Sequence, residues 1–318
     1  MNRLVAYRNP ILARELYKRS RARSTAVILT SYLFFFGLVF CWSYYVVYDN
    51  SERYAPNQYG YGYGFTQSDY ARLGQQSFET ALILILCVVG LLVPAIAANS
   101  IVGERRSQTL MPIQLSLLRP FDIVFGKIAS SVMLIVLLVL ATMPVLMVPY
   151  MIGGIRFSGV VGGLAVIVLT AFFVSAVSVL MSTLMKSSVA AIILSYVITA
   201  MFSFGLFTVL YIGIALYISL TTGWLYDTPV LIDVFVFLAL SINPLVALAH
   251  ASTIAASSDG LLGELSENLT GATTGIWLVD FLASEKIFWL GFYLVIVGIL
   301  SISSVRWACR KLRLPAKK

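Results

Sequence analysis

Residues 128–155 read IASSVMLIVLLVLATMPVLMVPYMIGGI, and this stretch without a charged side chain decides the class of the fold. A helix needs roughly 20 apolar residues to cross a hydrocarbon core about 30 Å thick, so the stretch is long enough to span a membrane. Comparable stretches recur, and six spans are predicted: residues 25–47, 80–102, 128–152, 159–184, 188–212 and 287–306. The sequence therefore predicts an all-α polytopic membrane protein in which residues 25–318 form a single transmembrane domain.

The composition of the 318-residue chain supports this class. Hydrophobic residues make up 59% of the chain and charged residues only 11%, whereas a soluble domain carries about 25% charge. The three cysteines are too few for a disulfide-stapled chain, and the single histidine, His250, leaves little room for zinc or Ser-His-Asp chemistry. Residues 1–24 are basic and amphipathic, unlike a cleavable signal peptide, so the first apolar run is the expected membrane signal.

Basic residues predict the orientation of the spans. With six spans and a cytoplasmic amino terminus, only four of the 22 lysines and arginines lie outside: Arg53, Arg72, Arg156 and Lys286. Cytoplasmic loops carry the excess of Lys and Arg in membrane proteins, so both termini are predicted to be cytoplasmic. Because the positive charges flank spans, they favour contact with anionic lipid over nucleic acid. The expected location is the inner or plasma membrane.

The stretch before the last span leaves the number of spans open. Residues 187–226 are uncharged over about twice the length of one crossing, and residues 234–250 could form another, which would give eight spans. We favour six, because residues 227–233 would otherwise be a cytoplasmic loop with two acids and no base. The outer loops are then residues 49–77 and 216–285. In the second, Asn243-Pro244 is expected to interrupt a re-entrant or outer helical excursion.

Residues 1–24 are predicted to form a cytoplasmic interfacial helix. Asn9 is a suitable N-cap, and Pro10 suits the first helical position. The side chains of this helix then separate onto two faces. The apolar face carries Leu12 and Leu16, and the basic face carries Arg14, Lys18 and Arg21. Such a helix can lie in the plane of the lipid headgroups. The alternative is a basic tail that only sets the topology.

Residues 103–127 form the second cytoplasmic segment of interest. Its middle is apolar but too short to span a membrane. A short helix there would present four side chains to a partner protein, namely Leu110, Gln114, Leu117 and Leu118. The alternative is an ordinary loop between two spans.

Several catalytic and binding motifs are missing from the sequence. It has no Gly-x-x-x-x-Gly-Lys-Ser/Thr to bind nucleotide phosphates, no His-Glu-x-x-His and no Gly-x-Ser-x-Gly. We therefore expect no catalytic residue, metal or cofactor site in this chain. The clear spans also lack charges near their middle, which are typical of ion-coupled carriers.

A series of short motifs runs through residues 103–127 into the third predicted span. The residues are Glu104-Arg105, Thr109-Leu110, Leu115, Leu117, Leu118, Pro120, Asp122, Ile123 and Gly126-Lys127. In this order they resemble the ABC-2 type permeases, the transmembrane subunits of one class of ATP-driven transporter. The departures from the family pattern are Gln108 where Gly is common, Met111 where Glu is common, Pro112 early in the helix, and Leu117 where Pro often stands. The opening residues Asn9-Pro10 and Arg14-Glu15-Leu16 resemble the family's interfacial helix.

The resemblance implies an exporter built from several subunits. Two permeases, identical or related, would pair around a central path, and two copies of an ABC-type ATPase, which bind ATP and Mg, would dock on the cytoplasmic side. The residues implied in coupling to the ATPase are Glu104, Arg105, Thr109, Leu110, Leu117 and Leu118. The interfacial helix would contribute Asn9, Pro10, Arg14, Glu15 and Leu16.

Aromatic residues in the spans are candidates for the translocation path. They are Phe35, Phe36, Phe202 and Phe207, although contacts with lipid or within the core explain them equally well. The sequence names no substrate. Two other functions stay open: a membrane scaffold that anchors a partner without transport, and an ion-coupled carrier, against which the absence of a visible internal repeat counts.

Overall fold

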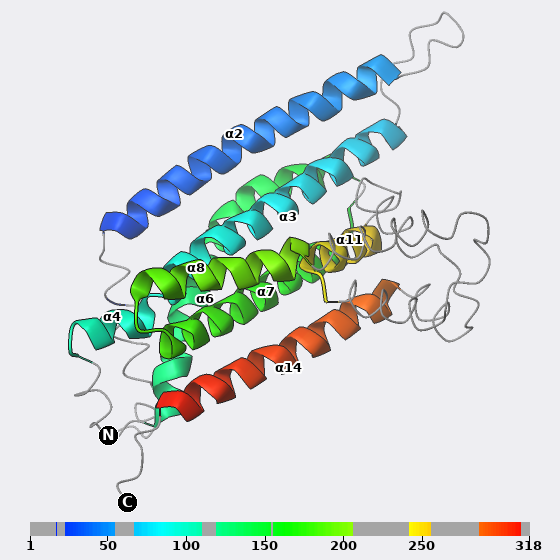
Figure 1. Ribbon diagram of the computed structural model, residues 1–318. Coiled ribbons are helices and arrows are strands. Elements are labelled where there is room, and N and C mark those ends of the chain that lie inside the picture. Colours follow the sequence, from blue (N-terminus) through cyan, green and yellow to red (C-terminus); the bar gives the residue numbers. More distant parts are fainter. Residues whose placement is uncertain are drawn as a thin grey trace, which may run out of the picture.

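The computed structural model describes Tyr17 and residues 23–54, 67–109, 119–153, 155–205, 242–255 and 286–312. These residues form α2 (Arg23–Tyr54), α3 (Gln67–Ala97), α4 (Ser100–Arg106), α6 (Pro120–Ile152), α7 (Phe157–Leu184), α8 (Ser188–Ala200), the π-helical η2 (Met201–Gly205), α11 (Pro244–Ala255) and α14 (Lys286–Leu312). The long helices run side by side in a bundle, with the short α4 at the end where α2 begins and α14 ends (Figure 1).

The described helices confirm an all-α polytopic membrane fold. Five are long and apolar enough to cross a membrane: Thr25–Val46, Tyr70–Arg106, Pro120–Ile152, Phe157–Leu184 and Leu290–Leu312. A shorter apolar helix covers Ser188–Ser203. It occupies the start of the predicted fifth span, and residues 206–212 of that span lie outside the described residues.

The helices extend beyond the predicted spans. The predicted outer loop 49–77 is helical at both ends, because α2 continues to Tyr54 and α3 begins at Gln67. Apolar content marks only the part of a helix that crosses hydrocarbon, and polar turns can continue it beyond that zone. Here the first turns of α3 are also packed against the bundle, where Gln75 and Glu79 are buried and Gln75 Nε2 donates to Glu79 Oε1 at 3.2 Å.

Helix α7 is the centre of the bundle. It contacts α3, α4, α6, α8, α11 and α14. Small residues along it, such as Gly163, Ala171, Ser175 and Ser178, let neighbouring helices approach closely, which is how helices associate in membranes. One polar contact ties it to α14: the hydroxyls of Thr170 and Tyr293 lie 2.6 Å apart and are buried.

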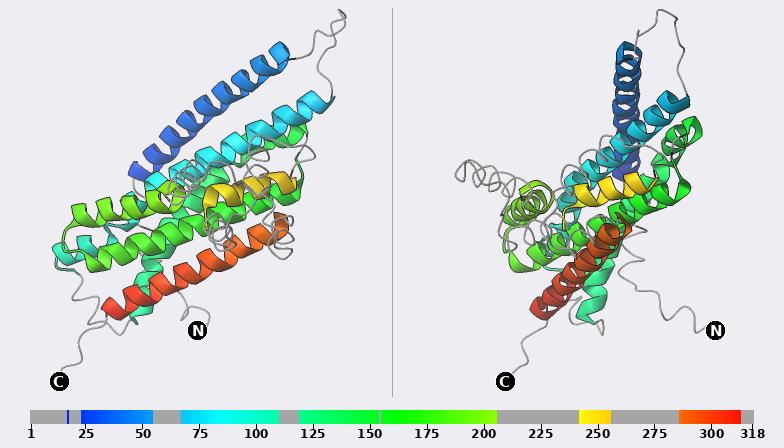
Figure 2. Two further views of the ribbon diagram at one scale, coloured as in Figure 1. Left: turned by 45° about the vertical axis from the view of Figure 1, so that its right-hand side comes forward. Right: turned by 90° about the vertical axis from the view of Figure 1, so that its right-hand side faces the viewer.

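Helix α2 lies at the edge of the bundle, as the two views of Figure 2 show. It packs mainly on α3 and has a sharply divided surface. One face is buried and carries Tyr32, Phe36 and Phe40, spaced one turn apart. The opposite face is exposed and carries large hydrophobic side chains, namely Phe34, Phe35, Leu38, Trp42 and Tyr45. In a bilayer this face meets lipid or another membrane chain.

A proline lies just before the end of α3. Pro94 has no N–H to donate, so the preceding turn loses a helical hydrogen bond. Tyr196 on α8 supplies a donor to the same turn, since its hydroxyl donates to the Leu91 carbonyl at 2.6 Å. The helix then stops at Ala97, and α4 begins at Ser100.

The predicted outer excursion contains a buried short helix, α11. Asn243 caps it, because Oδ1 accepts from the Leu245 N–H at 2.8 Å, and Nδ2 donates to the Ser203 carbonyl of η2 at 3.2 Å. Asn243-Pro244 therefore begins this helix. Its twelve residues are too few to cross a bilayer. They pack on α7 and α14, and His250 is buried among them.

Candidate functional site

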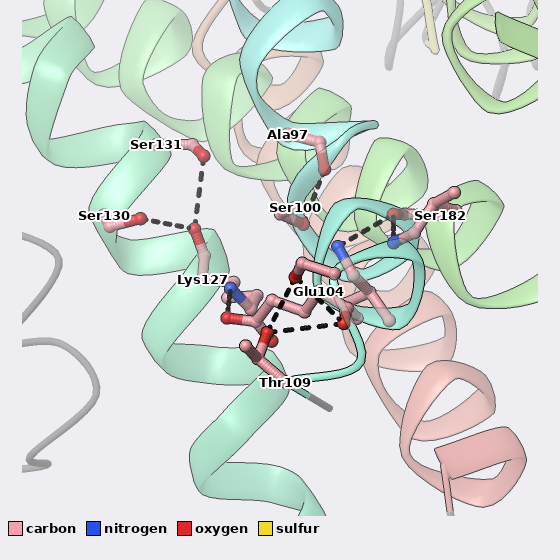
Figure 3. Close-up of polar contacts among 11 residues, drawn as sticks. Ala97, Ser100, Glu104, Thr109, Lys127, Ser130, Ser131 and Ser182 are labelled. Atoms are coloured by element: carbon pink, nitrogen blue, oxygen red, sulfur yellow. Dashed lines mark hydrogen bonds and ion pairs between the residues drawn. The ribbon is translucent and has the colours of Figure 1, made fainter. Parts of the chain in front are cut away.

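The candidate site is built around α4, the seven-residue helix that follows α3. Its first turn is anchored by apolar side chains, since Ile101 and Val102 are fully buried. Its last turn is basic and exposed, with Arg105 and Arg106. The helix therefore has one end in the bundle and one end available to a partner. Figure 3 shows its polar contacts.

An ion pair connects α4 to α6. Lys127 Nζ donates to Glu104 Oε1 at 2.8 Å, and the two side chains are 4% and 17% exposed (Figure 3). The Lys127 carbonyl also accepts from the hydroxyls of Ser130 and Ser131 at 2.9 and 3.1 Å. A lysine so deeply buried needs a carboxylate close by, because an isolated charge is costly to remove from water. The pair thus fixes α4 against the start of α6.

Arg105 connects α4 to the end of α7. Its Nη1 donates to the Met185 carbonyl and its Nη2 to the Thr183 carbonyl, both at 3.2 Å. These carbonyls belong to the last turn and the C-cap of α7, where backbone acceptors have no partner within the helix. A cation at a helix C-terminus is also favoured by the helix dipole.

The end of α4 is a Schellman motif. The Thr109 N–H donates to the Glu104 carbonyl at 2.9 Å, and the Gln108 N–H donates to the Arg105 carbonyl at 3.2 Å. Such a motif places its C′ residue in the left-handed region, and Gln108 has φ 57°. The Thr109 hydroxyl adds bonds to the Glu104 carbonyl at 3.3 Å and to the Ser107 hydroxyl at 2.9 Å. Thr109 therefore fixes the backbone of Glu104.

Glycine at position 108 should stabilise this turn. A residue with a Cβ is strained at φ 57°, whereas glycine adopts the left-handed region freely. Gln108→Gly is expected to raise the free energy of unfolding by about 0.5–1 kcal/mol, offset in part by the greater freedom of glycine in the unfolded chain. The check is an SDS unfolding titration in detergent micelles. Gln108→Ala, which keeps the Cβ, should give no gain.

The structure brings together three of the predicted coupling residues. Glu104, Arg105 and Thr109 all belong to the α4 turn and contact α6, α7 or one another. Leu110, Leu117 and Leu118 lie outside the described residues, as do the interfacial residues Asn9, Pro10, Arg14, Glu15 and Leu16.

Two members of the site were not predicted in their roles. Lys127 stood out in the sequence only through the Gly126-Lys127 motif, and its partner is 23 residues away. Ser182 gave no signal, because it is one of several serines in an apolar run. In the structure its Oγ accepts from the backbone N–H groups of Ile101 and Val102, both at 3.0 Å.

The phenylalanines proposed for a path do not gather in one place. Phe35 is 62% exposed and Phe36 is 2% exposed, so one lies on the exposed surface of α2 and the other on its buried surface. Phe202 packs against Phe173 of α7 at a ring distance of 4.5 Å. Phe207 lies outside the described residues.

Chemically, the site offers contacts and charges for a partner. Among the described residues, no group of three or more His, Cys, Asp or Glu side chains is placed to hold a metal ion. What the arrangement can do is transmit force, because a short helix that is exposed at one end is attached to two membrane helices by polar bonds.

A family model, described as ABC-2 family transporter protein, matches residues 10–252. The chain belongs to this ABC-2 family. The match contains the whole described site, from α4 through Lys127 to Ser182, and extends into α11. No curated protein matches the chain. As an ABC-2 permease, the protein is a multi-pass membrane subunit of an ABC transporter and works with an ABC-type ATPase subunit.

Proposed function

We propose that this ABC-2 permease exports a substrate with energy from ATP hydrolysis in two separate ATPase subunits, and that α4 receives their motion. The observation that carries the proposal is the attachment of α4. The helix is exposed at its basic end and is bonded to α6 through Glu104 and to α7 through Arg105. A partner that moves α4 would therefore move two membrane helices.

The charges of the described helices support an orientation with α4 in the cytoplasm. The helix ends that lie near α4 (Figure 1), with the segments next to them, carry most of the basic residues of the described chain: Arg23, Arg105, Arg106, Arg119, Lys127, Lys186, Arg306, Arg310 and Lys311. Membrane proteins place such residues on the cytoplasmic side. Both termini would then be cytoplasmic, in the inner or plasma membrane.

The ATPase subunits would bind ATP and Mg, and this chain would supply no catalytic residue. In such a complex, coupling arises because nucleotide binds more tightly to one state of the transporter than to the other. A second permease, identical or related, would complete the path, and the exposed aromatic face of α2 leaves room for a further chain or lipid.

The first test is affinity purification of the tagged protein in mild detergent, followed by mass spectrometry and an ATPase assay. The proposal expects a protein with Walker motifs in stoichiometric amount and ATPase activity in the eluate. Recovery of the chain alone, or with partners that lack ATPase activity, would instead support a membrane scaffold.

The second test addresses Glu104 in the assembled complex. Glu104→Ala removes the bond to α6, so we expect the ATPase activity of the complex to lose its response to transported substrate. The exchange variant Glu104→Lys with Lys127→Glu keeps an ion pair at this position and should retain part of the response. Normal activity and transport in Glu104→Ala would remove Glu104 from the coupling site.

A further inference from the structure

We propose that Ser182 is a positioning residue that makes α4 and the end of α7 move as one unit; the inference rests on the proposed role of α4 in coupling. Ser182 lies near the end of α7 and is 0% exposed. Its position in the sequence is 81 residues from Ile101, so the contact exists only in the folded bundle.

The first turn of α4 is capped by a residue of α7. A helix leaves its first backbone N–H groups without partners, and a side chain at the N-cap usually accepts from them. Asn99 occupies the N-cap of α4 but makes no such bond. The Ser182 Oγ accepts instead, from Ile101 N and Val102 N. The cap of α4 thus comes from another helix.

The other end of α4 is attached to the same segment. Arg105 donates to the carbonyls of Thr183 and Met185, which closely follow Ser182 along the chain. The bonds from the two ends of α4 therefore meet within residues 182–185, at the end of α7. Two attachments about one helical turn apart on α4 oppose both tilting and rotation of this helix.

A displacement of α4 would be transmitted mainly to α7. The ion pair with Lys127 is one contact to α6, whereas the bonds to residues 182–185 hold the whole of α4 on α7. Helix α7 in turn contacts α3, α6, α8, α11 and α14. Ser182 would therefore direct the motion of α4 into the centre of the bundle.

Hydrogen exchange on the permease alone tests the cap, using full-length protein in lipid nanodiscs. Ser182→Ala leaves the buried N–H groups of Ile101 and Val102 without their acceptor, so their exchange should become at least about tenfold faster. Ser178→Ala is the matched control. Ser178 lies one turn earlier on α7, is equally buried, and its hydroxyl has no partner in the described part of the chain. Unchanged exchange in Ser182→Ala would overturn the cap.

Steady-state ATPase kinetics of the purified complex test the positioning role. We expect Ser182→Ala to lower kcat by about fivefold or more with a much smaller change in the KM for ATP, because the substitution leaves the contacts of the nucleotide in the partner intact and weakens the transmission of motion through α4. Ser178→Ala should leave both constants unchanged. A merely structural loss would reduce the amount of complex recovered without this split. Arg105→Ala cuts the other attachment and should lower kcat in the same way, so the test survives if Ser182→Ala does not fold.

The outcomes separate the two proposals. If wild-type protein brings no ATPase with it, the proposed function fails, whereas the exchange experiment still decides whether Ser182 caps α4. If exchange is faster in Ser182→Ala but kcat and KM equal the wild-type values, the cap is only structural and the positioning role is wrong.

Discussion

Glu104→Ala is expected to lower the free energy of unfolding by about 3 kcal/mol, because it removes the Glu104 carboxylate from the buried charge of Lys127. The Lys127 side chain is only 4% exposed, so its ammonium group cannot regain full hydration without a rearrangement of α6. Breaking a buried pair from one side is much more costly than the net value of the pair. The measurement is an SDS unfolding titration in detergent micelles.

Two control variants define the origin of this loss. Lys127→Met should cost less than Glu104→Ala, since the Glu104 side chain is 17% exposed whereas that of Lys127 is 4% exposed. The double variant Glu104→Gln with Lys127→Met removes both charges and should recover most of the stability, as apolar replacements of buried pairs often do. Equal losses in both single variants, with no recovery in the double variant, would contradict this account.

Gly74→Ala is expected to lower the free energy of unfolding by about 2–3 kcal/mol, the upper part of the usual cost of overpacking. A Cβ at this position of α3 would collide with the carbonyl oxygen of Gly153 and lie 3.0 Å from the carbonyl oxygen of Pro149. Both are backbone atoms at the end of α6, so no side-chain rotation can relieve the collision. Gly153 itself has φ 107°, a conformation that favours glycine and holds its carbonyl there.

A matched control lies on the same helix. A Cβ added at Gly90 would have no other heavy atom of its surroundings within 4 Å, so Gly90→Ala should not lower the free energy of unfolding, and should raise it by about 0.4–1 kcal/mol because alanine has less freedom than glycine in the unfolded chain. Both variants are measured by the same SDS titration. A loss in Gly90→Ala as large as that in Gly74→Ala would show that helix flexibility, and not the contact with α6, sets the effect.

Local composition predicted the class of fold. Uncharged stretches are long enough to be recognised one by one, because each membrane helix satisfies its own backbone hydrogen bonds within one continuous segment. The ends of the helices were less predictable. The first turns of α3 are polar in sequence, and only their packing on the bundle explains why Gln75 and Glu79 are helical and buried.

The candidate site was predictable only in part. Glu104, Arg105 and Thr109 are close in sequence and form a recognisable motif, so they could be assigned to one place. Their partners Lys127 and Ser182 come from α6 and α7, and no local pattern connects them to α4. The sequence showed that Gln108 stands where the family commonly has glycine. The strain of a residue with a Cβ at this position, however, follows only from the left-handed backbone conformation of the turn.

By itself the sequence determined that the chain is an all-helical membrane protein of a transporter family, since length, hydropathy and short motifs act within single segments. The tertiary structure decided how the helices are joined. An ion pair to Lys127, a cap from Ser182 and a carbonyl contact at Gly74 depend on residues that meet only when the bundle packs. Such contacts are short-range, and distance along the chain carries no information about them.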